Sequence, residues 1–477
     1  MERRTVEKYL ESLTRFGVRL GLGRVRELLG ALGNPHRAFP AVHVTGTNGK
    51  GSVSRMIASI LEEAGYRTGL YISPHLERFN ERISVDGKDI PDRELAAIAG
   101  KVERAVDKMA KKKKQCTYFE ATTAVAFEYF RMMKVDVAVV EVGMGGRLDA
   151  TNVVDPLVSV ITNISLEHTD ILGTTLEKIA AEKAGIIKRG VPVVTAVWEP
   201  KVLDVIRKAA KQKSAPVFMM QRETRRRPIS KGLDGQVFSI YTDEDPYRGI
   251  KCKMAGDFQL ENAAIAVLAV ELVAGLQGQK GYVCYGVYPR SGPLRGRGSS
   301  GRSLPLTKPG ISAEIIKKGL ERARLPGRME FLRGKPTILL DSAHNPAAAE
   351  WAARGVAELA KGTFKGIHLL FGNLLDKDFV NVLKPLLSRA ETMTFAQSGS
   401  ERSVNVEDAE KQVRGMEKAA KGKACPKLHH AEFAPDVKSG VNIALRRAGK
   451  WDLVWVTGSM YLVGEVRAHL RKRGLVK

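Results

Sequence analysis

The stretch from Val42 to Arg55 places a glycine-rich turn between a short apolar run and a helical pattern. The apolar run ends at Val44, and the helical pattern begins near Gly51. Backbone N–H groups of such a turn converge at the first turn of a helix, where they favour phosphate. Lys50 adds a positive charge for the outer phosphates, and the hydroxyl of Ser52 is a ligand for phosphate or a metal ion. The pattern therefore predicts a strand that leads directly into a phosphate-binding helix.

The spacing of this turn differs from the common nucleotide-binding pattern G-x-x-x-x-G-K-[ST]. Only two residues separate Gly46 from Gly49, and another glycine, Gly51, follows the lysine. A glycine-rich turn that binds no nucleotide is therefore an open alternative at this point.

Length and composition indicate a soluble protein with several domains. The 477 residues suggest roughly two to four domains. No run of about eighteen apolar residues occurs, which predicts that the chain has no membrane span, and the first residues contain no apolar core of a signal peptide. The four cysteines are scattered without a CxxC pair, so neither a disulfide framework nor a zinc site is indicated. We therefore expect a cytoplasmic protein.

The formal net charge of +25 allows three interpretations. Basic residues gather at Lys111 to Lys114, at Arg222 to Arg227 and between Arg290 and Arg302. Solvated loops are the simplest interpretation, and the steering of polyanionic small molecules is the second. Nucleic-acid binding is disfavoured because aromatic residues do not alternate regularly with the basic ones, as a groove for single strands requires. We expect no nucleic-acid partner.

Apolar strands alternate with helical patterns through the first part of the chain, which predicts an α/β fold with a doubly wound, mainly parallel sheet. We assign residues 1–296 to this domain and expect a small β addition near 214–255. The glycine turn, Ser73, Glu141 and His168 each follow a predicted strand. Because ligands of such sheets bind beyond the carboxyl ends of the strands, these groups are expected to converge on one crevice.

A second, smaller α/β domain of Rossmann-like type is predicted for residues 311–477. Apolar strands at 337–340, 367–371, 393–396 and 453–456 each lead into a polar loop. Between the domains, residues 277–310 are rich in Gly, Pro, Ser and Arg and lose all periodicity, which indicates a linker-like insertion. A tolerated surface loop is its simplest interpretation.

Nucleotide phosphates require a divalent ion, and Mg²⁺ prefers oxygen ligands. Glu141 supplies a carboxylate and Ser73 a hydroxyl, whereas His168 by itself is more often a satisfied loop histidine. Asp149 can equally well hold Arg147 locally. Lys183 lies on the helix expected at about 174–188, for which Thr174 and Glu177 form a candidate capping box. A helix lysine is ordinarily a solvated charge, but addition of carbon dioxide makes it a carbamate with metal-binding oxygens.

Ten ordered sequence motifs resemble the bacterial folylpolyglutamate synthase/dihydrofolate synthase family of the Mur ligase superfamily. The resemblance covers nearly the whole chain. In the first domain it rests on residues 43–52, 71–76, 81–83, 118–120, 141–152 and 182–188, and in the second on residues 325–330, 341–346, 371–378 and 456–465.

The resemblance implies a set of site residues. Asn48, Gly49, Lys50, Gly51 and Ser52 would hold ATP, with Asn262 on the adenine side and Arg328 and Asp341 reaching the nucleotide from the second domain. Ser73, Glu141, His168 and a carbamylated Lys183 would hold magnesium, with two ions expected. Thr117, Tyr118, Phe119 and Glu120, together with Leu148, Asp149 and Ala150, would line the dihydropteroate pocket, and His344 and Ser459 would meet the incoming glutamate.

Three departures from the family pattern concern Arg19, Leu325 and the insertion. Family members that form dihydrofolate tend to have an acidic residue where this chain has Arg19, which weakens the expected pterin contact there. Leu325 replaces a tryptophan that often precedes the Pro-Gly-Arg turn, a change expected to be mild. The insertion at 277–310 has no recognised counterpart.

The resemblance implies an ATP-dependent amide ligase that joins L-glutamate to dihydropteroate and to folate polyglutamates, and we expect it to be a monomer. The substrate carboxylate attacks the γ-phosphate of ATP, and the glutamate amine then displaces phosphate from the acyl phosphate. Lys50, Lys183 and His344 are the expected catalytic residues, and closure of the two domains is expected to complete the site.

Three alternatives remain open. One is a folylpolyglutamate synthase without the dihydropteroate activity. A cell-wall Mur ligase is disfavoured by residues 118–120 and 73–75. A non-catalytic ATP switch that binds nucleic acid would use the basic charge, but the intact Glu141, His168, Lys183 and Arg328 argue against it.

Overall fold

The computed structural model describes residues 3–17, 19–243, 246–275, 310–419 and 430–476. The chain forms two compact units, which we describe separately. The first unit comprises residues 1–229, 238–252 and 260–323, and the second comprises residues 230–237, 253–259 and 324–477. Apart from Gly310, the predicted insertion at 277–310 lies outside the described residues.

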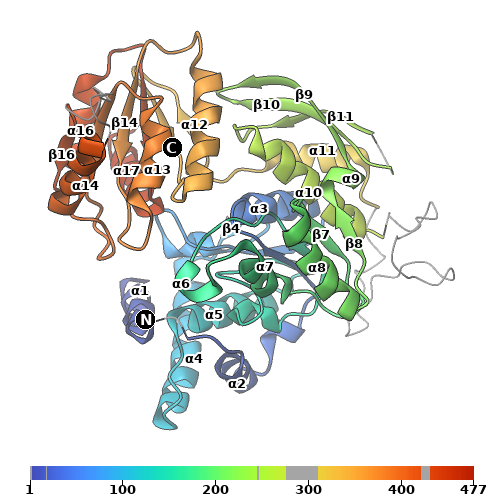
Figure 1. Cartoon of the computed structure of the whole chain (residues 1–477). Helices are drawn as coiled ribbons and strands as arrows, with labels where there is room; N and C mark the ends of the chain where they lie inside the picture. The colour runs from blue at the N-terminus through green and yellow to red at the C-terminus, as the bar shows by residue number, and fades with distance from the viewer. Residues whose placement is uncertain (1–2, 18, 244–245, 276–309, 420–429, 477) are drawn as a thin grey trace. The chain divides into compact units, whose positions relative to one another are not determined.

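An eight-stranded sheet forms the centre of the first unit, and its parallel part confirms the predicted α/β fold (Figure 1). Six neighbouring strands, from β2 to β8 in the sheet order, run parallel, and β3 and β4 extend one edge antiparallel. In sheet order the strands are β4 (Lys88–Asp89), β3 (Ile83–Val85), β2 (Thr68–Tyr71), β5 (Val137–Glu141), β1 (Ala41–Thr45), β6 (Pro156–Ile161), β7 (Val193–Thr195) and β8 (Val217–Met219).

Every residue of the central strands β5, β1 and β6 is buried, so both faces of this sheet are covered by helices. Helix α4 packs through one apolar face, because its buried residues recur at helical spacing; they include Leu95, Ile98, Ala99 and Val102. The helices of this unit are α1 (Arg3–Ser12), α2 (Gly23–Ala31), α3 (Lys50–Glu63), α4 (Asp92–Lys111), α5 (Tyr118–Met132), α6 (Thr169–Leu172), α7 (Leu176–Ala184), α8 (Pro200–Gln212), α9 (Met220–Glu223), α10 (Phe258–Val273) and α11 (Ala313–Arg322).

A separate three-stranded sheet follows the main one in the chain. It contains β9 (Arg225–Gly232), β10 (Gly235–Tyr241) and β11 (Pro246–Cys252), in the order β11-β10-β9. The hydroxyls of Tyr247 and Thr242 donate to the fully buried carboxylate of Glu271 on α10, at 2.6 and 2.7 Å, and so attach this sheet to that helix. These three strands lie within residues 214–255, and β8, near the start of that stretch, belongs to the main sheet.

The second unit is built on a six-stranded sheet with the order β12-β13-β17-β14-β15-β16. Only β12, at one edge, runs antiparallel to its neighbour. The strands are β12 (Glu330–Leu332), β13 (Thr337–Leu340), β14 (Ile367–Phe371), β15 (Thr392–Ala396), β16 (Glu432–Ala434) and β17 (Leu453–Thr457), and the helices are α12 (Pro346–Ala360), α13 (Phe379–Leu387), α14 (Val406–Ala419), α16 (Val437–Arg447) and α17 (Met460–Lys472). The four strands predicted here are all present.

Two local predictions differ from the structure. The helix expected at 174–188 is α7, Leu176–Ala184, and its N-cap is Thr175, whose hydroxyl accepts from the N–H of Lys178. The predicted box of Thr174 and Glu177 is therefore wrong by one residue. Helix α11, which the sequence analysis placed in the second domain, packs against α3 in the first unit.

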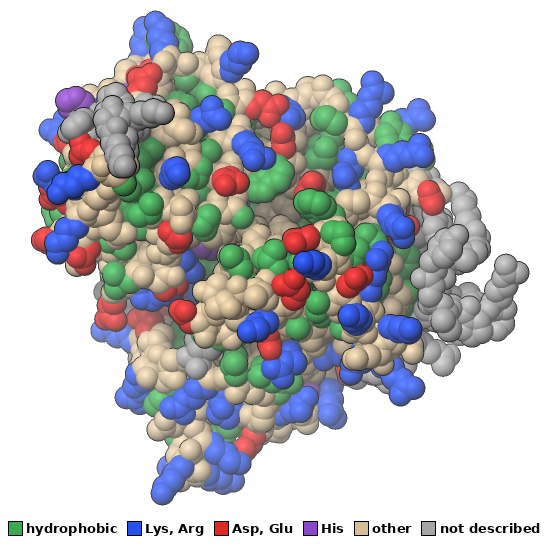
Figure 2. All heavy atoms as spheres, viewed as in Figure 1, with side chains coloured by type: hydrophobic (Ala, Val, Ile, Leu, Met, Phe, Trp, Pro, Cys, Tyr) green, Lys and Arg blue, Asp and Glu red, His purple; other side chains and the backbone are tan. Residues whose placement is uncertain are grey.

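Basic side chains lie at the surface among acidic ones. Figure 2 shows Lys and Arg spread over the visible face with Asp and Glu between them, and a concentration of basic side chains over the end of α4. Lys114, which follows that helix, pairs with Glu27 at 2.7 Å. The basic stretch between Arg290 and Arg302 lies outside the described residues. Among the helices that the structure describes, none is long and apolar enough to cross a membrane.

The contact between α11 and α3 generates a stability prediction. A Cβ atom at Gly319 would lie 2.5 Å from the Cα atom of Ile60, so the two helices must separate to admit a methyl group. We expect Gly319→Ala to lower the free energy of unfolding by about 1–3 kcal/mol, as overpacking does. The measurement is urea unfolding followed by circular dichroism.

Gly415→Ala on α14 is the matched control, because a Cβ there meets nothing within 4 Å. Alanine at this helical position should be neutral or stabilising by up to about 1 kcal/mol. Equal unfolding midpoints for the two variants would contradict the proposed packing constraint.

Candidate active site

The glycine turn connects β1 to α3 as the sequence predicts, and its glycines leave no room for side chains. Gly49 is the N-cap of α3 and has φ +84°, and a Cβ there would lie 2.6 Å from the amide oxygen of Asn262. A Cβ on Gly46 would lie 1.8 Å from the hydroxyl of Thr162. The structure thus brings Asn262, predicted for the adenine side, against the turn at residues 46–49, which we call the phosphate loop.

Lys50 folds back over this loop. Its ammonium group donates to the carbonyl oxygens of Gly46 at 3.0 Å and Thr47 at 2.9 Å. Gly51 and Ser52 lie in the first turn of α3, and Ser52 is buried. The helix N-terminus and this lysine together give the loop a positive electrostatic character, which suits a polyphosphate.

The loop that follows β6 holds the phosphate loop in place. Asn163 accepts the N–H of Asn48 through its amide oxygen at 2.9 Å, and its carbonyl accepts the N–H of Thr47 at 2.8 Å. The N–H of Ser165 donates to the hydroxyl of Thr47 at 3.0 Å. Sequence reasoning missed Asn163, although a polar residue two positions after an apolar strand was a usable signal.

Lys183 is the most unusual charged residue of the unit, because its side chain is only 1% exposed. Its ammonium donates to the carbonyl of Gly46 at 2.7 Å and pairs with Glu167 at 2.6 Å. Burial, partly offset by Glu167, lowers the pKa of Lys183 to about 8. Burial by itself would raise the pKa of Glu167, but the charges of Lys50 and Lys183 outweigh it and lower that pKa to about 2. Sequence reasoning did not single out Glu167.

Two of the predicted magnesium ligands lie side by side. The backbone N–H of Ser73, just after β2, donates to the carboxylate of Glu141 at the end of β5, at 2.9 Å. His168 lies in the loop after β6, is exposed, and has φ +48°. Among the described residues, no three His, Cys, Asp or Glu side chains gather into a metal-binding group. A hydroxyl and a buried carboxylate supply hard oxygen donors, which fit Mg²⁺.

The glycine-rich loop after β5 is packed from two sides. A Cβ at Gly143 would lie 2.4 Å from the ring of Phe119, and one at Gly146 would lie 2.9 Å from backbone oxygens of α7. The hydroxyl of Thr45 donates to the carbonyl of Gly145 at 2.7 Å. This loop therefore connects the end of β1 with the helix that carries Lys183.

Asp149 uses its carboxylate to shape that loop. It accepts the N–H of Met144 at 2.9 Å, and the N–H of Thr151 at the same distance. Burial raises the pKa of Asp149, and these hydrogen bonds oppose the shift. The alternative that Asp149 holds Arg147 is wrong, because Arg147 pairs with Glu182 at 2.7 Å.

The predicted pterin-lining stretch 117–120 forms the first turn of α5. Thr117 and Glu120 make a capping box. The N–H of Glu120 donates to the hydroxyl of Thr117, and the N–H of Thr117 donates to the carboxylate of Glu120. Glu120 also pairs with Arg24 at 3.0 Å. These two residues thus have structural roles that the sequence analysis missed, although the T-x-x-E spacing signals them.

Aromatic rings lie beside this turn. Phe119 stacks on Tyr71 with ring centroids 6.0 Å apart, and the guanidinium of Arg82 lies 5.5 Å from the Tyr118 ring centre. Tyr118 and Phe119 pack against the hydrophobic cluster that includes Ala150, so the two predicted stretches meet. Leu148 is half-buried, and Arg19 is exposed.

In the second unit, the predicted residues lie at the carboxyl ends of β13 and β17. Asp341 is buried and accepts the N–H groups of Met329 at 3.1 Å and Ala343 at 3.0 Å. Arg328 donates to the carbonyl of Ser342 at 3.3 Å. Burial raises the pKa of Asp341, and Arg328 opposes this shift.

His344 and Ser459 lie in the same region. His344 Nδ1 is 2.9 Å from the carbonyl of Ser342, which can only accept, so Nδ1 carries the proton. Ser459 caps α17 by accepting the N–H of Tyr461 at 3.2 Å. Gly458, next to it, donates to the carbonyl of Ala343 at 3.0 Å. The structure therefore brings these residues of the second unit together.

Comparison with known proteins agrees with this arrangement. Residues 44–270 match the Mur ligase middle domain, and residues 327–460 match the Mur ligase glutamate ligase domain. The chain is 35% identical to the dihydrofolate synthase/folylpolyglutamate synthase of Bacillus subtilis (strain 168) over 468 residues, which cover 97% of this chain and 98% of the relative.

Solved structures extend the likeness to the fold. Folylpolyglutamate synthase of Mycobacterium tuberculosis, complexed with ADP and AMPPCP, has a TM-score of 0.82 at 30% identity, covering 98% of this chain and 99% of that one. E. coli FolC in complex with DHPP and ADP has a TM-score of 0.79 at 28% identity, covering 98% of each chain. The chain therefore belongs to the dihydrofolate synthase/folylpolyglutamate synthase family of Mur ligases.

Proposed function

We propose that this protein is an ATP-dependent amide ligase that joins L-glutamate to dihydropteroate and to tetrahydrofolate polyglutamates, giving ADP and phosphate. The observation that carries the proposal is the phosphate loop braced by the buried Lys183, because a loop of this form suits an ATP polyphosphate. The B. subtilis relative is named for both activities, and the E. coli structure contains DHPP and ADP. We expect a cytoplasmic monomer without nucleic-acid or membrane partners.

The proposed reaction needs positioning and charge neutralisation more than a protein nucleophile. A substrate carboxylate oxygen attacks the γ-phosphorus and ADP leaves, giving an acyl phosphate. The amine of glutamate then attacks the acyl carbon, and phosphate leaves from the tetrahedral intermediate. Asn48 to Ser52 would hold the phosphates through backbone N–H groups, and Lys50 would turn from the loop carbonyls toward them. Asn262 is assigned to the adenine side.

We assign Ser73, Glu141 and His168 as ligands of magnesium, with two ions expected. The bound ions would neutralise phosphate charge. A carbamate on Lys183 would add oxygen ligands: its neutral amine adds to the carbon of CO₂ and releases a proton, which reverses the charge of the side chain. The negative carbamate would repel Glu167, so the ion pair seen here would belong to the unmodified lysine.

The residues of the second unit complete the assignment. Arg328 and Asp341 are assigned to the nucleotide, and His344 and Ser459 to the incoming glutamate. Because Nδ1 of His344 donates to a carbonyl, its Nε2 is the atom suited to accept the proton of the glutamate amine. The stretches 117–120 and 148–150 are assigned to the pterin.

A folylpolyglutamate synthase without the dihydropteroate activity is the second candidate, favoured by Arg19 in place of an acidic residue. Glutamate-dependent phosphate release by the purified chain, measured with dihydropteroate and with tetrahydrofolate, separates the two. We expect release with both substrates. Release with tetrahydrofolate alone would establish the second candidate, and release with neither would overturn the proposed function.

Lys183→Ala should abolish turnover, because it removes both the brace on Gly46 and the proposed metal ligand. A small carboxylic acid such as acetate should restore part of the activity by occupying the place of the carbamate. Phosphate release measured with and without acetate tests this. Lys178→Ala, an exposed lysine on the same helix, is the control and should retain activity. An active Lys183→Ala enzyme that ignores acetate would show that the carbamate is unnecessary.

Gly49→Ala should weaken ATP binding at least tenfold, measured by calorimetry. The positive φ of Gly49 is strained for alanine by about 1–2 kcal/mol, and the new methyl group collides with Asn262. Gly23→Ala, at the start of α2, meets open space and is the control. Equal ATP affinities in the two variants would remove this turn from the nucleotide site.

A further inference from the structure

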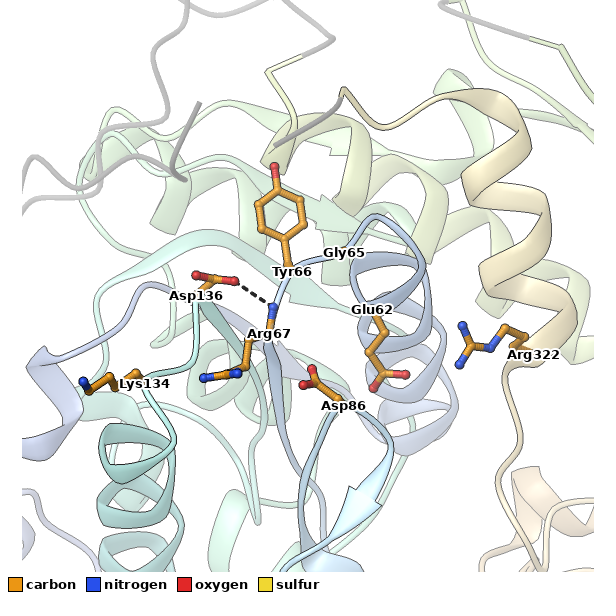
Figure 3. A pocket seen from close by; sticks show the side chains of 8 residues that line it. All are labelled: Glu62, Gly65, Tyr66, Arg67, Asp86, Lys134, Asp136 and Arg322. Carbon is orange, nitrogen blue, oxygen red and sulfur yellow. Dashed lines mark hydrogen bonds between the residues drawn. The ribbon is translucent and has the colours of Figure 1, made fainter. Parts of the chain in front are cut away.

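A cavity lies at the amino ends of strands β2 and β5, at the edge of the main sheet opposite the candidate active site. It has a volume of about 530 Å³ and lies within the first unit (Figure 3). Arg67 precedes β2, Lys134 and Asp136 precede β5, and Glu62 lies in the last turn of α3. The phosphate loop is at the other end of α3, about 18 Å away along the helix. The cavity is therefore separate from the predicted ATP site.

The cavity is lined by three carboxylates and three cations rather than by apolar side chains. Figure 3 shows Lys134 and Arg67 toward one side, Asp86 and Glu62 in the middle, and Arg322 beyond them. Asp86 and Arg322 act electrostatically on Glu62, which places them near its carboxylate. Cations therefore lie on both sides of Glu62 and Asp86, and the third carboxylate, Asp136, lies beside Arg67 and accepts its backbone N–H at 2.7 Å.

Glu62 lacks a hydrogen-bond donor for one of its oxygens. Its Oε2 accepts from Arg55 at 2.6 Å, but Oε1 is buried and has no partner in the described structure. The side chain is only 7% exposed. Burial, reinforced by Asp86, raises the pKa of Glu62 in spite of Arg55 and Arg322. A buried carboxylate oxygen without a donor is costly, and the nearby carboxyl end of α3 adds negative potential. An additional cation with N–H donors would satisfy it.

The cations that line the cavity can form further hydrogen bonds and ion pairs. Lys134 is exposed and makes no ion pair or side-chain hydrogen bond with any described residue. Arg67 donates to the carbonyl of Met133 at 3.2 Å, and Arg322 pairs with Glu63 at 2.6 Å while 61% of its side chain stays exposed. These side chains can donate hydrogen bonds to the carboxylates of a ligand.

We propose that this cavity binds a free α-amino dicarboxylic acid of the size and charge of L-glutamate. Its ammonium group donates to Glu62 and Asp86, one carboxylate meets Lys134 and Arg67, and the other meets Arg322. A metal ion fits poorly, because the cations Arg67, Lys134 and Arg322 line the cavity together with its carboxylates. A phosphate group carries no cation for Glu62 and Asp86. A glutamate whose nitrogen is acylated, as in a folate tail, lacks the ammonium group and is excluded.

The test is isothermal titration of the full-length protein with L-glutamate, without ATP or folate. We expect saturable binding of L-glutamate. N-acetyl-L-glutamate, which lacks the cation, and glutarate, which lacks the nitrogen, should bind at least tenfold more weakly. Absence of saturable binding at millimolar concentrations, or equal binding of N-acetyl-L-glutamate, would overturn the proposal.

Two variants keep the local fold while changing the cavity. Asp86→Asn retains the oxygen that accepts the N–H of Thr68 at 2.9 Å and tolerates the φ of +51°. Lys134→Gln removes the free cation, and its matched control is Lys113→Gln, an exposed lysine that also has a positive φ. Each cavity variant should weaken the binding of L-glutamate at least tenfold, and the control variant should leave it unchanged.

A variant of the second unit distinguishes this cavity from the proposed reaction site. His344→Ala should leave the titration with L-glutamate unchanged, because His344 is assigned to the substrate glutamate and not to the cavity. If His344→Ala abolishes binding while Asp86→Asn and Lys134→Gln do not, the bound glutamate occupies the reaction site and the cavity proposal fails. Failure of the cavity variants alone leaves the proposed function intact.

Discussion

The contact between the buried ammonium of Lys183 and the carbonyl of Gly46 is the interaction on which the candidate active site depends. It ties helix α7 to the turn between β1 and α3. A buried cation requires compensation, and Glu167, from the loop after β6, supplies it. The hydrogen bond and the ion pair thus join the turn after β1 to two segments that follow β6, the loop with Glu167 and helix α7. Any process that changes the charge of Lys183 would change the support of the phosphate loop as well.

Close packing of backbone makes this arrangement rigid. Gly46 and Gly49 face Thr162 and Asn262 at distances that exclude a methyl group, and Gly143 faces the ring of Phe119 in the same way. The loops after β1, β5 and β6 are therefore held by steric contact as well as by hydrogen bonds. Because these loops are already ordered, binding of a charged ligand costs little free energy for ordering them.

Helix α3 has opposite electrostatic roles at its two ends. Its amino terminus begins at the phosphate loop, where the partial positive charge favours an anion. Its carboxyl terminus carries Glu62, beside Asp86, where the partial negative charge adds to two carboxylates. The first end suits ATP, and the second suits a cation such as an ammonium group. The same element would thus support the two proposed ligand sites, which differ in chemistry.

The sequence alone predicted the fold and most of the residues that gather in each unit, because strand periodicity and glycine spacing are local properties of the chain. The positions of Ser73 and Glu141 beside each other follow from strands β2 and β5, which end at one edge of the sheet. Asn262, in contrast, lies on helix α10, and its assignment came from the family resemblance. Helix boundaries were less accurate: Thr175, not Thr174, caps α7, because neighbouring threonines offer equivalent hydroxyls and only the backbone geometry selects one.

Only the tertiary structure decided which partner each charged group has. Arg147 pairs with Glu182, so Asp149 is left to the loop, and Lys183 pairs with Glu167. The partners lie 35 and 16 residues apart in the chain, and no helix or strand spacing relates them. The cavity around Glu62 likewise combines α3, α11 and the turns before β2 and β5, and no local pattern signals it. Sequence therefore determined the strands, the glycine turn and the family, whereas burial and long-range contacts decided which charges are neutralised and which remain for ligands.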